Sequence, residues 1–283
     1  MNHSVCRRLL AIASLTSLLF GGAYAAPRSC YRAMRTTAPG ATGLTLILID
    51  TTTAKNEQVV VALRTMLGKA LNHAGERVLV ASFAGMVPGQ YPAVLADVLQ
   101  EPQPSPALES DKVLDWSTKL RVCLAGLPKM NRTAVLSAMS TCIGRDVTAP
   151  YSEIIAGVRW ALTELLPSLT VANPTIPVRV VVFSDGEQNS RSGMTFYKNG
   201  APRDISADKE LDLLSAAEKI THPTGNKTAI DVWWLGLGLQ PPGQKFFMTP
   251  QALAERKRFW SGVLKLYGAR KTAIGFTLTD DNF

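Results

Sequence analysis

Short runs of branched aliphatic residues, separated by stretches of helical periodicity, constrain the fold of this chain more than any other feature. Residues 44–49 read LTLILI, the composition of a strand that is buried on both faces. The next stretch places Val60, Leu63 and Leu67 on one helical face and ends at Gly75, a residue that favours helix C-termini. Further strands are predicted at residues 77–83, 178–183, 229–235 and 272–279, and helices at residues 54–74, 152–166, 207–220 and 250–267. This alternation predicts an α/β fold with a doubly wound, mostly parallel central sheet and helices on both faces.

Residues 88–145 interrupt the alternation. They contain a proline-rich stretch at residues 101–106 and then two helical stretches, which we expect to be joined by the turn Leu-Pro-Lys at residues 127–129. We interpret this segment as a helical insertion into one domain that spans residues 43–283. One elaborated domain suits a chain of this length better than two separate cores.

The N-terminus has the pattern of a secretory signal peptide. Arg7 and Arg8 precede an apolar run at residues 9–20, and the small-residue site Ala-Tyr-Ala follows at residues 23–25. We predict cleavage after Ala25, which leaves residues 26–42 as a polar N-terminal segment and exports the chain to the periplasm or the cell exterior. The alternative is that residues 9–20 stay as an uncleaved anchor, although such anchors are usually longer.

Three cysteines remain after the predicted signal, an odd number for an oxidising compartment. Cys123 and Cys142 lie on the two expected helical stretches, which an antiparallel hairpin would bring together, so we predict a disulfide between them. Cys30 could instead replace either partner or pair with another chain.

The charge is mildly basic. The whole chain has a formal net charge of +8, and removing Arg7 and Arg8 with the signal leaves 28 − 22 = +6. The cations are scattered and are not interleaved with aromatic residues, a pattern that argues against a nucleic-acid partner. No apolar run after the signal reaches the roughly 18 residues of a transmembrane helix, so none is expected in the mature chain. We expect a protein partner with an acidic surface.

Polar residues follow the predicted strands where a parallel sheet gathers its ligands. Residues 50–54 (DTTTA) follow the first strand, residues 146–148 (DVT) precede a long helix, and residues 184–187 (SDGE) follow the strand at 178–183. Asp and Thr are also ordinary helix caps, and Asp-Gly is an ordinary turn. The three segments nevertheless fall on one edge of the predicted sheet.

In this order the three segments resemble the metal-ion-dependent adhesion site of von Willebrand factor A domains and integrin inserted domains. The resemblance extends over most of residues 43–280. It implies a site for Mg²⁺ or Mn²⁺ held by Asp50, Thr52, Thr148 and Asp185, with an acidic residue of a protein partner completing the shell. The sequence departs from the family pattern at Ala54, where a second serine hydroxyl is missing, so the expected affinity for metal is low.

The segment after Asp185 forms a long polar stretch at the same edge. Arg191, Tyr197, Lys198 and Arg203 lie on it and are the predicted partner-binding residues, although a merely solvated loop is an equal alternative.

An enzyme is the main alternative to a binding module. Asp50, Ser82 and Asp185 could be fitted to a haloacid-dehalogenase-like phosphohydrolase, but that class needs a second Asp where this chain has Thr52. The Gly-x-Ser-x-Gly, P-loop and dinucleotide motifs are also missing. The sequence therefore favours a non-enzymatic, exported binding module of the kind used in adhesion, surface assembly, or secretion and conjugation machinery.

Overall fold

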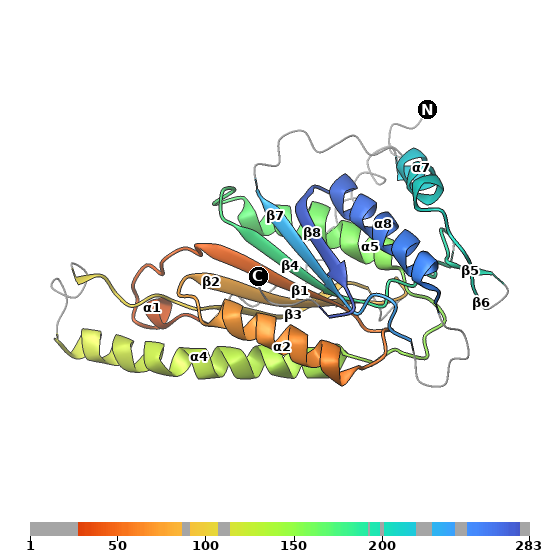
Figure 1. The fold of residues 1–283 in the computed structure, drawn as a ribbon. Helices are drawn as coiled ribbons and strands as arrows, with labels where there is room; N and C mark the ends of the chain where they lie inside the picture. The colour runs from red at the N-terminus through yellow and green to blue at the C-terminus, as the bar shows by residue number, and fades with distance from the viewer. Residues whose placement is uncertain are drawn as a thin grey trace, which may run out of the picture.

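The computed structural model describes residues 28–86, 91–106, 114–191, 193–198, 201–218, 228–240 and 248–277. The predicted signal peptide, residues 1–25, lies outside the described residues. A six-stranded sheet forms the centre of the molecule (Figure 1). Its strands are β1 (Gly43–Asp50), β2 (Glu76–Phe83), β3 (Ala93–Leu99), β4 (Val178–Phe183), β7 (Ile230–Leu235) and β8 (Ala269–Gly275).

The strands lie in the order β3-β2-β1-β4-β7-β8, and every neighbouring pair is parallel except β2 with β3. Counted along the chain, these six strands have the order 3-2-1-4-5-6, which is the order of doubly wound α/β folds. The predicted fold class is therefore confirmed. The order reverses between β1 and β4, and this is the point at which such sheets open a crevice for ligands.

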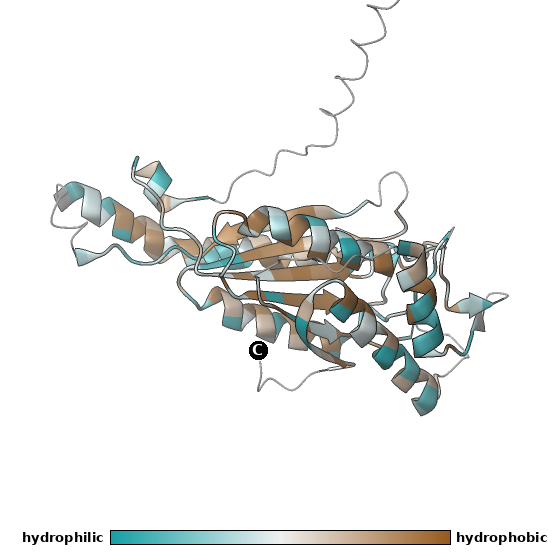
Figure 2. Ribbon diagram, turned by 90° about the horizontal axis from the view of Figure 1, so that it is seen from above, coloured by the Kyte–Doolittle hydropathy of each residue, from teal (hydrophilic) through white to brown (hydrophobic). Residues whose placement is uncertain are grey.

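Helices cover both faces of the sheet. One face is covered by α2 (Glu57–Leu71) and α4 (Leu114–Cys142), which lie side by side in Figure 1. The other face is covered by a continuous helical stretch and two further helices, and a core of buried apolar residues lies on each side of the sheet. These helical elements are α5 (Ile154–Arg159), the π-helical segment η2 (Trp160–Leu165), α6 (Leu166–Thr170), α7 (Ala207–Glu218) and α8 (Pro250–Leu266). The strands of the sheet are mostly coloured as hydrophobic in Figure 2.

Burial on both faces explains the apolar character of β1. Leu46 and Leu48 point into the core beneath α5 and α8, whereas Ile47 and Ile49 point into the core beneath α2 and α4. All eight residues of the strand are buried. A polar residue on either side of this strand would lie in a core, which is why the run lacks the alternation of a half-exposed strand.

Residues 88–145, predicted as a helical insertion, supply an edge strand and a covering helix of the main sheet. β3 pairs antiparallel with β2, and α4 packs against β3, β2 and α2. No strand is predicted here, because residues 93–99 (AVLADVL) have no strict alternation of apolar and polar residues and include residues that are common in helices. Pairing with β2 decides its conformation.

The predicted helical hairpin is wrong. α4 is continuous through Pro128, so no turn occurs at residues 127–129. Pro128 is exposed, and the buried residues Leu124, Leu127 and Val135 keep a helical spacing across it. Packing along the whole helix thus compensates for the hydrogen bond that proline removes.

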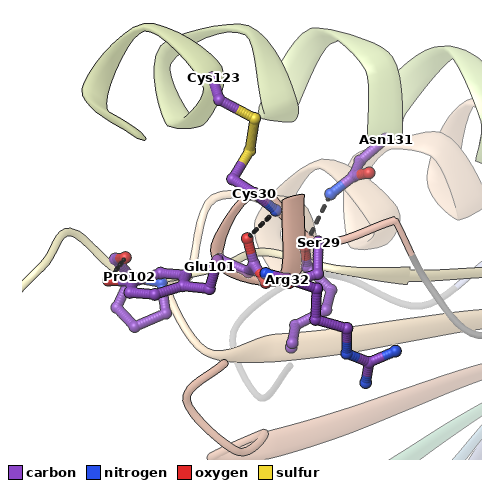
Figure 3. Close-up of a disulfide and its surroundings, with 9 residues drawn as sticks. Ser29, Cys30, Arg32, Glu101, Pro102, Cys123 and Asn131 are labelled. Atoms are coloured by element: carbon purple, nitrogen blue, oxygen red, sulfur yellow. Dashed lines mark hydrogen bonds between the residues drawn. A yellow bond between two sulfur atoms is a disulfide. The ribbon is translucent and has the colours of Figure 1, made fainter. Parts of the chain in front are cut away.

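The predicted disulfide between Cys123 and Cys142 is wrong for the same reason. On one helix, 142 − 123 = 19 residues correspond to about 28 Å at 1.5 Å per residue, which is far beyond disulfide reach. The structure instead joins Cys123 to Cys30, with a Cα–Cα distance of 5.8 Å (Figure 3). Cys142 is a free thiol in the core beneath α4, and burial raises its pKa.

Polar contacts hold the short helix α1 (Cys30–Ala33) beside the disulfide. The Glu101 carboxylate accepts hydrogen bonds from the backbone N–H of Cys30 at 2.7 Å and from the Ser29 hydroxyl (Figure 3). The Tyr31 hydroxyl donates to the Pro102 carbonyl at 3.0 Å. A small apolar cluster, separate from the two main cores, surrounds the bridge and consists of Cys30, Tyr31, Leu120, Leu124 and Leu127.

Replacing Cys30 by Ser is expected to lower the free energy of unfolding by about 2–4 kcal/mol, because the bridge joins residues 93 positions apart. Urea denaturation measures this loss. Peptide mapping without reduction should give a crosslinked Cys30–Cys123 peptide, and Cys142→Ala should leave that peptide unchanged. A dominant bridge that contains Cys142 would contradict the assignment.

Candidate functional site

The candidate site lies at the carboxyl ends of β1 and β4, where the strand order reverses. β1 ends at Asp50, and the segment 184–187 follows β4 directly. A third segment, residues 146–152, meets them there, because Ser152 reaches Asp50 and Asp146 reaches Thr51. The structure therefore brings together the three polar segments that the sequence singled out.

The Asp50 side chain is fully buried and accepts four hydrogen bonds. One carboxylate oxygen accepts from the Thr52 backbone N–H at 3.0 Å and from the Thr52 hydroxyl at 2.6 Å. The other accepts from the Ser152 hydroxyl at 3.0 Å and from the Ser184 hydroxyl at 2.9 Å. Because a carboxylate has about four acceptor positions, Asp50 is saturated by protein donors.

Two further threonines fix the backbone around this carboxylate. The Thr51 hydroxyl contacts the Asp146 carboxylate at 2.6 Å, and the Asp146 N–H donates to the Thr51 carbonyl at 2.8 Å. The Thr53 hydroxyl accepts from the Asp185 N–H at 3.1 Å, which ties the end of β1 to the end of β4. The hydroxyls of the three threonines at 51–53 thus contact three different carboxylate or backbone groups: Thr51 contacts Asp146, Thr52 contacts Asp50 and Thr53 contacts the Asp185 N–H.

Asp185 begins a tight turn. One of its carboxylate oxygens accepts from the Glu187 N–H at 2.9 Å, and Gly186 has a φ of +77°. A Cβ atom at Gly186 would lie 2.4 Å from the Leu237 side chain, so both conformation and space require glycine here. The Trp260 indole N–H donates to the Gly186 carbonyl at 3.0 Å and braces the turn from α8.

Burial makes this pair of carboxylates costly to ionise. Burial raises the pKa of Asp50, and the hydrogen bonds from Thr52, Ser184 and Ser152 act in the opposite direction. Burial, followed by repulsion from the Asp50 charge, raises the pKa of Asp185 well above its usual range. Buried acids that repel each other concentrate at functional sites.

A buried ion pair adjoins the site and connects it to α8. Arg256 is 1% exposed; its guanidinium donates to both carboxylate oxygens of Glu187, one of them at 3.2 Å, and to the Arg203 carbonyl at 3.2 Å. Its guanidinium also lies 5.6 Å from the centre of the Phe196 ring. Burial raises the pKa of Glu187 while Arg256 lowers it, so each charge needs the other.

The predicted metal ligands are only partly assembled. Asp50, Thr52 and Asp185 lie together, but Thr148 is exposed and, among the described residues, makes no hydrogen bond to Asp50 or Asp185. Ala54 is buried and offers no oxygen. In the described part of the chain, no three His, Cys, Asp or Glu side chains gather as metal ligands, so a cation here would need hydroxyl and water oxygens.

Sequence reasoning missed Ser152 and Ser184 as partners of Asp50. Ser184 stands within the segment already singled out, but its hydroxyl points back to β1 and not outward. Ser152 is the residue that takes the place beside Asp50 for which Thr148 was proposed. The sequence does place a hydroxyl residue near the start of the long helix, but it places several there, so Ser152 could not be singled out.

The predicted partner-binding residues differ in their surroundings. Arg191 and Lys198 are exposed, and Tyr197 is half-buried in the two-stranded ribbon of β5 (Tyr197–Lys198) and β6 (Ala201–Pro202). Burial raises the pKa of Tyr197.

Arg203, the fourth of these residues, is engaged within the protein. It donates to the Thr195 carbonyl at 2.9 Å and pairs with Glu210 of α7 at 2.8 Å. It therefore holds the loop against α7.

A groove of about 630 Å³ opens beside this loop, between α5 and α7. Ile155, Met194 and Leu214 contribute to its apolar lining. Two ion pairs stand among its lining residues, Arg203–Glu210 at 2.8 Å and Arg159–Glu218 at 3.2 Å.

No known protein family and no curated protein matches this sequence. Among solved structures, the chain is similar to the TFIIH p34 N-terminal domain (13% identity, 84% of this chain and 92% of that one, TM-score 0.34). It is also similar to BatB from Bacteroides thetaiotaomicron (12%, 82% and 90%, TM-score 0.35) and to the PilB minor pilin from Streptococcus sanguinis (10%, 85% and 59%, TM-score 0.38). Scores of this size do not establish a common fold, so the fold is assigned from strand order alone.

Asp185→Asn is expected to raise the free energy of unfolding at neutral pH. The pKa of Asp185 is higher in the folded than in the unfolded protein, so the folded state holds this proton more tightly. The contribution of Asp185 to the free energy of unfolding is therefore fully present at acid pH and is lost as the pH rises through the folded pKa. Asparagine keeps an oxygen for the Glu187 N–H and carries no charge. The advantage of the variant, about 1 kcal/mol or more at pH 7, should shrink toward acid pH in urea denaturation. The control is Asp204→Asn, which removes an exposed carboxylate. If it raised the free energy of unfolding as much as Asp185→Asn does, burial of Asp185 could not be the cause of the gain.

Proposed function

We propose that this protein is an exported binding module that resembles von Willebrand factor A domains. One observation carries the proposal: Asp50 with Thr52, and Asp185 with Gly186, meet at the switch point between β1 and β4. This is the edge at which doubly wound sheets bind ligands, and it has the residue order to which the sequence resemblance points.

The covalent chemistry supports export. The Cys30–Cys123 disulfide is the kind of bond that persists in oxidising compartments, and it begins at the first helix after the predicted signal. None of the helices in the described residues is long and apolar enough to cross a bilayer.

We propose a protein partner that docks at this edge through an acidic residue. The exposed Arg191 and Lys198 lie on the loop that follows Asp185, and the groove between α5 and α7 adjoins it. The loop is anchored at its base, because Ser152 and Asn189 exchange two backbone hydrogen bonds at 2.9 Å. A loop held in this way loses little entropy on binding, which suits adhesion, surface assembly, or secretion and conjugation machinery.

We propose further that the site binds a divalent cation, Mg²⁺ or Mn²⁺, with low affinity. Asp185 and the hydroxyl oxygens around Asp50 are the residues that would hold it, with Thr148 as the outermost candidate. When bound, the cation would supply a positive charge for an acidic residue of the partner. Its weakness follows from the saturation of Asp50 by four donors and from the missing oxygen at Ala54.

Millimolar Mn²⁺ is expected to raise the melting temperature of the wild type slightly, because a ligand that binds only the native state stabilises it by mass action. Ala54→Ser adds an oxygen and should enlarge the shift, whereas Asp185→Ala should abolish it. Differential scanning calorimetry measures all three. If neither the wild type nor Ala54→Ser responds to Mn²⁺, the cation has no place in the function.

We also propose that the protein has no phosphohydrolase or esterase activity, because Thr52 donates its hydroxyl hydrogen to Asp50 and cannot act as the second acid of such a site. The purified chain should show no turnover of p-nitrophenyl phosphate or p-nitrophenyl acetate. Turnover that disappears in Asp50→Asn would establish the enzymatic alternative and overturn this part of the proposal.

A further inference from the structure

The two helical layers of the molecule differ in charge. Together, α2 and α4 carry six cations and two acids, a balance of 6 − 2 = +4. The helices of the opposite layer, from α5 to α8, carry six of each sign. We call the six cations of α2 and α4 the basic face: Arg64, Lys69, Lys119, Arg121, Lys129 and Arg132.

The two acids of α2 and α4 both stand in the first turn of their helix. Glu57 stands in the first turn of α2 and pairs with Lys55 at 2.7 Å. Asp115 stands in the first turn of α4 and pairs with Lys119 at 2.7 Å. Both positions are those that a helix dipole favours for acids. Beyond them, neither helix contains an acidic residue.

The cations of the two helices belong to one surface. α2 and α4 lie next to each other against the same face of the sheet (Figure 1). The Arg132 guanidinium of α4 reaches over Gly68 of α2, where an added Cβ would lie 3.3 Å from it. On α4, Arg121 and Lys129 are exposed, and Lys129 lies on the side opposite to the buried Leu120 and Leu124. On α4 the cations run from Lys119 to Arg132, which are 132 − 119 = 13 residues apart, or about 20 Å along the helix.

Aliphatic side chains are exposed among these cations. Val122 is 70% exposed, Val61 is 56% exposed and Met130 is 46% exposed. The one aromatic residue of the two helices, Trp116, is half-buried and donates its indole N–H to the Met34 carbonyl at 3.3 Å. The surface therefore combines cations and aliphatic groups without an exposed ring.

This combination distinguishes between classes of partner. Protein interfaces concentrate aromatic anchors and are depleted in lysine, and grooves for single-stranded nucleic acid need aromatic stacking. An extended helical surface with lysines, arginines and isolated aliphatic residues matches the headgroup region of an anionic bilayer, where long cationic side chains reach the phosphates.

We propose that the basic face docks the protein peripherally on a membrane rich in anionic phospholipids. The two helices would then lie parallel to the bilayer, with their cations at the headgroup phosphates and Val122 and Met130 at the boundary with the acyl chains. The carboxyl ends of β1 and β4, where the candidate site lies, would not face the bilayer, because they lie at the ends of the strands and not on the sheet face that α2 and α4 cover. The inference does not depend on the cation site.

The test measures binding of the mature chain, which lacks the apolar run of the signal, to sedimented vesicles. Vesicles of phosphatidylcholine with about 30% phosphatidylglycerol should bind the wild type, and pure phosphatidylcholine vesicles should not. The double variant Arg64→Glu/Lys129→Glu should lose at least about tenfold in affinity. Added salt should weaken wild-type binding, because it screens the charges.

The matched control changes the net charge equally on the opposite layer. Lys209→Glu/Lys257→Glu, at two exposed residues of α7 and α8, should stay within about twofold of the wild type. Melting temperatures verify that both double variants are folded, and Arg64→Gln/Lys129→Gln replaces the first one if it is not. The loss of vesicle affinity in Arg64→Gln/Lys129→Gln should be smaller than in the glutamate variant but larger than in the control variant.

Three results would overturn the proposal. The first is that the wild type fails to bind the anionic vesicles, and the second is that both double variants lose affinity equally, since net charge alone would then explain binding. The third is that the basic face binds poly-glutamate but not vesicles, because its partner would then be an acidic protein surface.

Discussion

The buried carboxylate of Asp50 is the interaction on which the rest of the site depends. A charge without water must be surrounded by donors, and here the donors come from three segments that are far apart in the sequence: Thr52, Ser152 and Ser184. Each segment is held at the position from which its hydroxyl reaches the same two oxygens. The positions of the end of β1, the end of β4 and the start of α5 relative to one another therefore depend on hydrogen bonds to the single side chain of Asp50.

The central part of the fold could be predicted because its signals are local. β1 and β4 are buried on both faces, so their sequences are apolar except for Thr45 and the terminal Asp50 in β1 and for Arg179 in β4. Thr249 caps the Ala252 N–H and, with Pro250, marks the start of α8. β3 could not be predicted, because an edge strand takes its conformation from its neighbour. The continuity of α4 across Pro128 could not be predicted either, because the sequence around a proline on the solvent side of a helix does not differ from the sequence around a proline in a turn.

For the site, the sequence indicated the right edge but not all of its contacts. Asp50, Thr52 and Asp185 could be found because they directly follow strands whose carboxyl ends must meet. The partners Ser152, Ser184 and Arg256 depend on side-chain directions across the sheet edge and on the packing of α8 against the loop, which no local pattern encodes. Thr148 illustrates the reverse case: the residue type and its order along the chain fit, but the turn leaves it exposed.

The disulfide also has a mechanical consequence for a protein that is held at its N-terminal end. Cys30 stands at the start of α1, and its partner Cys123 stands within α4, after β1, α2, β2 and β3 have been completed. Tension applied ahead of α1 passes through the two sulfur atoms directly into α4. The intervening chain, which includes the central strand β1, lies outside the path of the force, so its strands cannot be drawn out of the sheet one residue at a time from that end.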